Sequence, residues 1–242
     1  LPQKRFAILI ANWKEEDVLE RMVRGNLSRL DYSKFRIFLG VYPNDPATWQ
    51  VARRLEREFS QVSIVVNHLP GPTSKGQLLN EMAGKILASE QETGLRYDAF
   101  LLQDSEDLMH AQSLNLLNSM LDRAGFVQIP VFSLKTPYRD FVAGTYADEF
   151  AESHTKNLLV RKSLGAAVPS AGVGTAISRE LVLGVDLRLV EIEALVFIDP
   201  SHVVARGGIP EPLHLDAVHR DLHPVGVLGG RRVRVAHPAI DE

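Results

Sequence analysis

Residues 97–107 read YDAFLLQDSED, a largely apolar run that passes directly into a cluster of acidic residues. The first six residues predict a β-strand, because a short run of apolar and aromatic side chains has the length and composition of a buried strand. Three carboxylates follow within four positions, at Asp104, Glu106 and Asp107. Ligands of open α/β sheets bind beyond the carboxyl ends of the strands. The stretch therefore predicts a binding site at the edge of a sheet.

The same order of short apolar strand, polar segment and amphipathic helix recurs on both sides of this stretch. We expect strands over residues 6–11, 35–41, 62–67, 97–102 and 126–131, and helices over about 13–30, 46–59, 75–89, 114–121 and 148–162. This alternation is typical of βαβ units. It predicts an α/β fold with a Rossmann-like, mostly parallel sheet flanked by helices.

Two capping patterns define where helices begin. Asn12 and Glu15 have the spacing of a capping box, which predicts the start of the first helix. Asp45 followed by Pro46 predicts an N-cap and a first-turn proline for the second helix. The cap role of Asp45 is compatible with a ligand role, because the residue also follows the second strand.

Composition excludes several classes of protein. The chain has 242 residues, 45% hydrophobic and 24% charged, with no cysteine. This is typical of one or two globular domains and excludes thiolate zinc sites and a cysteine nucleophile. A formal net charge of −3 gives no sign of a nucleic-acid partner. Because the chain opens on Leu1 with neither a signal peptide nor an apolar run of about 20 residues, we expect a soluble fragment of a longer protein whose membrane segments lie outside it.

The acidic cluster has two interpretations. Asp104 and Glu106 stand at alternate positions and could offer oxygens to one hard cation such as Mg²⁺ or Mn²⁺. The same carboxylates could instead be acidic caps of the following helix, favoured by its dipole. Their place at the carboxyl end of a strand favours the metal site.

Other motifs are weaker. Residues 71–76 (GPTSKG) lack the Gly-Lys-Ser/Thr ending of a Walker A loop, but Lys75 and a helix N-terminus could bind an anion, or Ser74 could simply cap the helix. Residues 172–177 (GVGTAI) half match a dinucleotide fingerprint, and no Gly-x-Ser-x-Gly elbow of a serine hydrolase is present. Histidines and aspartates over residues 214–223 could ligate a metal or be incidental.

Taken in order, these stretches resemble family 2 glycosyltransferases of the GT-A fold, over roughly residues 4–183. The opening segment ANWKEE (11–16), Lys75 with Asn80, and the Asp104-Ser-Glu106 triplet resemble family motifs. Longer stretches resemble the glycosyltransferase domain of the bacteriophage adsorption protein B group: VYPNDPAT (41–48), PGPTSK (70–75), QIP (128–130), GTYADEFAE (144–152) and PSAGVGT (169–175). That group implies a parent protein of the bacterial inner membrane whose catalytic domain lies on the cytoplasmic face.

The resemblance implies a role for each matched residue. Asp104 and Glu106 would hold the metal, and Asp107 would orient one of these two carboxylates. The resemblance places the following residues at the nucleotide-sugar site: Asn12, Glu15, Asp45 at the base or ribose, Lys75 near the nucleotide, Asp104, and Gly174 and Thr175 along the cleft for donor sugar and acceptor.

The implied reaction is transfer of a sugar from a nucleotide-diphosphate sugar, expected to be a UDP-sugar, to a glycan or lipid-linked acceptor. It would invert the anomeric centre, use Mg²⁺ or Mn²⁺, and serve the synthesis of a bacterial surface or secreted polysaccharide. The family's Thr-Glu-Asp segment, which holds the catalytic base, and its Gln-x-x-Arg-Trp helix are not found in residues 185–242. The base is therefore unassigned.

We accordingly expect a truncated GT-A domain over residues 1–184 and an atypical tail over residues 185–242, either disordered or frame-shifted. Two other functions are compatible with the sequence. One is a non-catalytic nucleotide-sugar binding module of a membrane polysaccharide or phage-receptor complex. The other is a nucleotidyltransferase, although the segment after the first strand lacks the Gly-rich basic loop expected there.

Overall fold

The computed structural model describes residues 2–133, 139, 141–166 and 168–184, together with two strands in the C-terminal part. The chain divides into two compact units, Leu1–Val203 and Val204–Glu242. The described elements of the first unit are β1 (Phe6–Ala11), α1 (Leu19–Arg29), β2 (Phe35–Val41), α2 (Pro46–Glu58), β3 (Val62–Val66), α3 (Lys75–Thr93), β4 (Ala99–Gln103), α4 (Ser113–Met120), β5 (Phe126–Gln128), α5 (Phe141–Glu152), η1 (Ser153–Asn157), α6 (Leu158–Ser163), β6 (Thr175–Ser178) and α7 (Arg179–Gly184).

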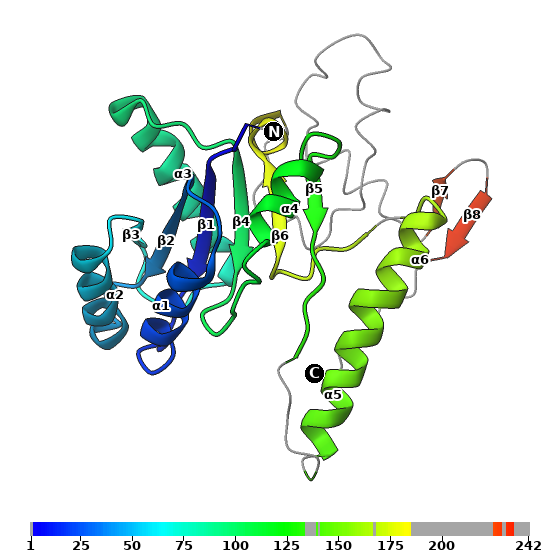
Figure 1. Ribbon diagram of the computed structural model, residues 1–242, viewed down its shortest axis with the longest axis horizontal. Helices are drawn as coiled ribbons and strands as arrows, with labels where there is room; N and C mark the ends of the chain where they lie inside the picture. The colour runs from blue at the N-terminus through cyan, green and yellow to red at the C-terminus, as the bar shows by residue number, and fades with distance from the viewer. Residues whose placement is uncertain are drawn as a thin grey trace. The chain divides into compact units, whose positions relative to one another are not determined.

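Six strands form one sheet in the order β3-β2-β1-β4-β6-β5 (Figure 1). β1 pairs in parallel with both β2 and β4, and β2 pairs in parallel with β3. β6 runs antiparallel to β4 and to β5. The predicted α/β fold with a mostly parallel sheet is thus confirmed. The strand order reverses at β1, and such a switch point is where open α/β sheets bind ligands.

Alternate side chains of the central strand enter two separate apolar layers, which explains why helices cover both faces of the sheet (Figure 1). Phe6, Ile8 and Ile10 of β1 pack in the layer with residues of α1, α2 and α4. Ala7 and Leu9 pack in the opposite layer with residues of α3. Both layers are made of buried residues, so the strands of the sheet are rigid supports for the loops at their ends.

One predicted cap is confirmed and one is wrong. The Asp45 carboxylate accepts a hydrogen bond from the Thr48 amide at the start of α2, as expected. The Asn12–Glu15 capping box does not form, because α1 begins at Leu19 and has no side-chain cap. Asn12 is instead buried at the end of β1, where its amide bonds to strand carbonyls. The spacing of a capping box cannot distinguish these two uses of an asparagine.

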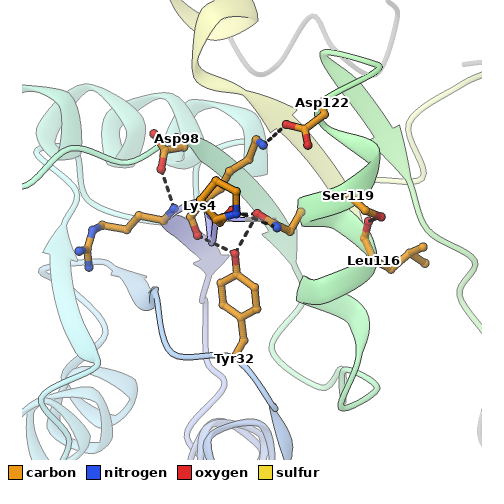
Figure 2. Close-up of polar contacts among 9 residues, drawn as sticks. Lys4, Tyr32, Asp98, Leu116, Ser119 and Asp122 are labelled. Atoms are coloured by element: carbon orange, nitrogen blue, oxygen red, sulfur yellow. Dashed lines mark hydrogen bonds and ion pairs between the residues drawn. The ribbon is translucent and has the colours of Figure 1, made fainter.

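A network of hydrogen bonds and an ion pair fixes the amino end of the sheet (Figure 2). The Tyr32 hydroxyl donates to the Lys4 carbonyl at 2.8 Å and to the Asn118 side-chain oxygen at 3.1 Å. The Lys4 amide donates to the same Asn118 oxygen, and its ammonium pairs with Asp122. Burial and then the charge of Asp98 raise the pKa of Tyr32 to about 12. This network joins α4 to the chain just before β1, at the end of the sheet away from the acidic loop.

The remaining segments either differ from the prediction in extent or were not predicted. The expected helix over 148–162 begins earlier, at Phe141, and contains a π-helical turn at η1. In the second unit, β7 (Val225–Leu228) and β8 (Arg231–Arg234) form an antiparallel pair where no strand was expected. The histidine and aspartate candidates over 214–223 lie outside the described residues, and the domain boundary at 184 stays a prediction. Among described helices, none combines the length and hydropathy that a membrane span requires.

Candidate functional site

The predicted site residues lie at the carboxyl ends of three parallel strands and at the start of one helix. The loop after β1 carries Asn12 and Glu15, the loop after β2 carries Asp45, the loop after β4 carries Asp104, Glu106 and Asp107, and α3 begins at Lys75. Parallel strands place these ends on the same edge of the sheet. An ion pair between Lys75 and Asp104 joins the helix to the loop after β4.

Asn12 links three strands at this edge. Its side-chain nitrogen donates to the carbonyls of Ile10 and Gly40, each at 2.9 Å, and its side-chain oxygen accepts from the Ser105 hydroxyl at 3.0 Å. The residue is 1% exposed. Every polar atom of the amide group is therefore engaged within the protein, and Asn12 fixes the start of the acidic loop relative to β1 and β2. The predicted contact of Asn12 with a nucleotide sugar stays a prediction.

Asp45 couples the loops after β1 and β2. One carboxylate oxygen accepts from the Lys14 amide at 2.7 Å and the other from the Thr48 amide at 3.4 Å. Lys14 has a φ of 59°, a left-handed conformation that non-glycine residues seldom adopt. The Glu15 amide next to it donates to the Thr48 hydroxyl at 3.0 Å. Asp45 thus holds the loop after β1 in shape, and its predicted contact with a base or ribose is untested.

Four carboxylates gather around the loop after β4. Burial raises the pKa of Glu15, and the charges of Glu106 and Asp104 raise it further. Burial likewise raises the pKa of Asp107, and the charges of Asp104 and Glu106 raise it further. These shared causes show that the loops after β1 and β4 bring their acidic groups within electrostatic range. Such a concentration of negative charge is favourable only next to a cation or a row of hydrogen-bond donors.

Among the described residues, Lys75 places a positive charge next to this acidic cluster. Its ammonium pairs with Asp104, and the two side chains are 36% and 34% exposed, so solvent reaches the pair. Glu106 is exposed, whereas Asp107 is partly buried and its Oδ2 makes no hydrogen bond with any described residue. Lys75 and Asp104, which were predicted as separate site residues, are therefore in contact, and Asp107 lies within electrostatic range of Asp104 and Glu106, one of which it was expected to orient.

Gly174 and Thr175 reach the same sheet from its antiparallel part. The Gly174 amide donates to the Leu102 carbonyl at 2.8 Å, just before the acidic loop. Gly174 has a φ of 67°, and a Cβ there would lie 2.8 Å from a side-chain carbon of Ile129, so glycine is required. Thr175 is fully buried, and its hydroxyl donates to Gln128 at 2.7 Å. The lining role expected for these two residues stays a prediction.

Several residues that shape the site carry no role in the sequence analysis. Gln128 holds the glycine loop: its side chain donates to the Val173 carbonyl and accepts from the Ala171 amide. Trp13 packs edge-on against Tyr42, with ring centroids 5.2 Å apart. A Cβ on Gly71 would overlap the Trp13 ring, so the loop before α3 passes directly against that ring. An aromatic residue two positions after a strand is the signal that could have identified Trp13.

The same loop is closed by a reciprocal pair of hydrogen bonds. The Asn44 side-chain nitrogen donates to the Gly71 carbonyl, and the Gly71 amide donates to the Asn44 side-chain oxygen, each at 2.6 Å. The Tyr42 hydroxyl contacts the Thr73 hydroxyl at 2.7 Å. The segment after β2 therefore positions the residues that precede Lys75.

The donor atoms fit a divalent hard cation held jointly by protein and ligand. Carboxylate oxygens are the ligands that Mg²⁺ and Mn²⁺ prefer. Within the described residues, no group of three or more acidic, histidine or cysteine side chains is arranged to hold a metal by itself. Asp104 and Glu106 can supply two ligands, so further ligands must come from water or a bound molecule. A diphosphate provides such oxygens, and its negative charge also suits Lys75.

Comparison with known proteins agrees with this geometry. A family model described as "Glycosyltransferase like family 2" matches residues 2–202. Bacteriophage adsorption protein B of Escherichia coli strain K12 and Bacteriophage N4 adsorption protein B of Escherichia coli O157:H7 are each 38% identical to the chain over 180 residues, 74% of this chain and 24% of theirs. The chain thus spans about a quarter of the length of these curated relatives.

A solved structure shares the fold. The mannosyltransferase PcManGT from Pyrobaculum calidifontis, in complex with GDP-Man and Mn²⁺, superposes with a TM-score of 0.50 at 17% identity, covering 75% of this chain and 46% of that one. At this identity the likeness concerns the fold alone. It supports the GT-A architecture that the family resemblance implies.

Proposed function

Because the chain belongs to the family 2 glycosyltransferases, we propose that it transfers a sugar from a nucleotide-diphosphate sugar, in the first instance a UDP-sugar, to a glycan or lipid-linked acceptor. The observation that supports this is the meeting of Lys75, Asp104, Glu106 and Glu15 at the switch point of the sheet. A cation and clustered carboxylates at that edge suit a diphosphate bound with a divalent metal. Inversion at the anomeric carbon belongs to the same proposal.

Each group of the chain has a definite task in this proposal. Lys75, at the first position of α3, would donate to a diphosphate oxygen, and the free amides of the helix start favour the same negative charge. Asp45 and the Lys14 backbone would shape the nucleoside side of the site. The glycine loop at Gly174 would limit the space for the sugar. Positioning of both reactants in this way lowers the barrier without any covalent intermediate.

The metal fits the two carboxylates of the loop after β4. Asp104 and Glu106 would hold Mg²⁺ or Mn²⁺, and Asp107 would orient them from the partly buried side. When bound, the metal would act as a Lewis acid that stabilises the charge of the departing nucleoside diphosphate. The base that accepts the acceptor's proton is not assigned to any described residue.

Isothermal titration calorimetry with UDP and UDP-N-acetylhexosamines, with and without Mn²⁺, tests the proposal. We expect binding that requires Mn²⁺ and is lost when Asp104→Ala and Glu106→Ala are combined. Glu92→Ala is the matched control, because Glu92 is an exposed carboxylate of α3. Binding that survives the double substitution, or no binding by the unmodified chain, would contradict the assigned donor site.

A non-catalytic role of the same site is the second candidate. The sequence that follows Gly184 lacks the family's segment for the catalytic base, which favours binding without transfer. Incubation of the chain with UDP-sugar, Mn²⁺ and candidate glycan acceptors would separate the two: UDP release that depends on the acceptor supports the transferase, and binding without release supports the binding module. We further propose that the longer parent protein works at the cytoplasmic face of the bacterial inner membrane in surface or secreted polysaccharide synthesis, as the family resemblance of the sequence implies.

A further inference from the structure

Asn26 of α1 contacts the acidic loop from behind. The residue is 1% exposed and lies among the apolar positions of α1 that face the sheet. Its side-chain nitrogen donates to the Asp107 carbonyl at 2.9 Å, and its side-chain oxygen accepts from the Met109 amide at 2.8 Å. One side chain therefore satisfies two backbone groups of a loop more than eighty residues away in the chain.

An asparagine at this position is unfavourable for the helix itself. Asparagine has a low helix propensity, and a buried amide is tolerated when its hydrogen bonds are satisfied. The buried neighbours of Asn26 on α1 are Leu19, Met22 and Val23, so an apolar residue would suit the packing. The benefit of the amide lies in the loop, because the Asp107 carbonyl and the Met109 amide lie outside the helices and strands.

The loop is thereby anchored on both sides of Glu106. Ser105 is tied to Asn12 at 3.0 Å near the strand end, and Asp107 and Met109 are tied to Asn26. Glu106 lies between the two anchors. Since Asp104, Glu106 and Asp107 carry like charges, a loop without the second anchor would be free to move the carboxylates apart.

We propose that Asn26 is a positioning residue of the donor site, which holds Asp104 and Glu106 in the arrangement that binds a divalent cation together with a nucleoside diphosphate. Asn26 touches neither ligand and acts through the backbone of Asp107 and Met109. The inference rests on the function proposed above. Residues that orient metal ligands typically change metal affinity about tenfold to a hundredfold when they are replaced.

The test compares two buried asparagines with equivalent local roles. Asn118 of α4 is 5% exposed and also bonds to backbone groups, but at the opposite end of the sheet. Asn26→Ala should weaken binding of Mn²⁺ and UDP by about tenfold or more, whereas Asn118→Ala should destabilise the fold and leave both affinities unchanged. Titrations are run where circular dichroism shows all three proteins to be folded.

Equal affinities in the Asn26→Ala variant and the unmodified chain would overturn the inference while leaving the proposed function intact. If the unmodified chain binds neither ligand, the proposed function fails and the inference fails with it. Amide hydrogen exchange in the unmodified chain supplies a measurement that does not depend on a variant. The Met109 amide should exchange slowly, although it lies outside any helix or strand, and exchange as fast as that of an exposed loop amide would also overturn the inference.

Discussion

Gly71→Ala and Gly84→Ala add the same methyl group to two glycines and should have opposite effects on stability. A Cβ on Gly71 would overlap the Trp13 ring and lie 2.7 Å from the Tyr42 ring, much closer than carbon atoms can pack. A Cβ on Gly84, exposed in α3, would meet no atom within 4 Å. The first change crowds the loop before Lys75. The second reduces the backbone freedom of the unfolded chain at a position that is helical in the folded protein.

The magnitudes follow from these surroundings. Overpacking costs about 1–3 kcal/mol, so Gly71→Ala should lower the free energy of unfolding by about 2 kcal/mol. Replacing an interior helical glycine by alanine contributes about 0.5–1 kcal/mol, which Gly84→Ala should gain. For a chain of this size 1 kcal/mol shifts the melting temperature by roughly 2–4 °C, so we expect a loss of roughly 4–8 °C for Gly71→Ala and a gain of roughly 1–4 °C for Gly84→Ala.

Differential scanning calorimetry measures the stabilities, and titration with UDP and Mn²⁺ measures the site. Because Trp13 and Tyr42 are rigid rings, the loop must move when Gly71 is replaced, and Lys75 directly follows this loop. Gly71→Ala should therefore also weaken UDP binding, whereas Gly84→Ala should not. A Gly71→Ala variant that melts at or above the temperature of the unmodified chain would refute the packing of Trp13 against this loop.

Three further substitutions test separate contacts. Lys75→Met removes the partner of Asp104 and should weaken UDP binding about tenfold, the equivalent of about 1.5 kcal/mol for one charge-assisted hydrogen bond; an unchanged affinity by calorimetry would exclude Lys75 from the donor site. Arg179→Met leaves Glu90, whose side chain is 7% exposed, as an unpaired buried charge and should cost about 3 kcal/mol in urea unfolding without affecting UDP binding. Burial raises the pKa of Tyr32 to about 12, so the stability gained from its neutral form is complete below about pH 10 and is lost as pH rises from about 10 to about 12. Tyr32→Phe should therefore make the free energy of unfolding less dependent on pH in this interval. An equal dependence in the variant and the unmodified chain would argue against the raised pKa.

The parallel strands and most helices could be predicted from the sequence, because short-range physics specifies them, whereas β6, β7 and β8 were not expected. Apolar runs of strand length place β1 to β4 within about two residues, and Asp45 with Pro46 marks the start of α2. The start of α1 was wrong, because the role of Asn12 depends on carbonyls of β1 and β2 that the chain brings together only on folding. Tertiary contacts decide such cases, and local spacing does not contain them.

The candidate site shows the same division. Asp104, Glu106 and Lys75 could be found because charged residues next to strand and helix ends stand out in a sequence. Asn26 and Gln128 could not, because each is a neutral residue whose partners are wholly or mostly backbone groups of other loops. A backbone partner leaves no trace in residue type, so no pattern of side chains along the chain points to it.

The neutrality of these anchoring residues has a physical reason. A lysine or arginine at the position of Asn12 or Asn26 could not accept the hydrogen bonds from Ser105 or Met109, and it would weaken the negative potential that attracts a cation. An amide fixes the backbone and carries no net charge, so the carboxylates keep their field. Lys75 is the exception, and its half-exposed ion pair with Asp104 can open when a diphosphate offers the ammonium new partners. Among the residues that the structure describes, the charge of this loop is therefore held in place by neutral amides and offset in part by Lys75, whose ion pair stays exchangeable.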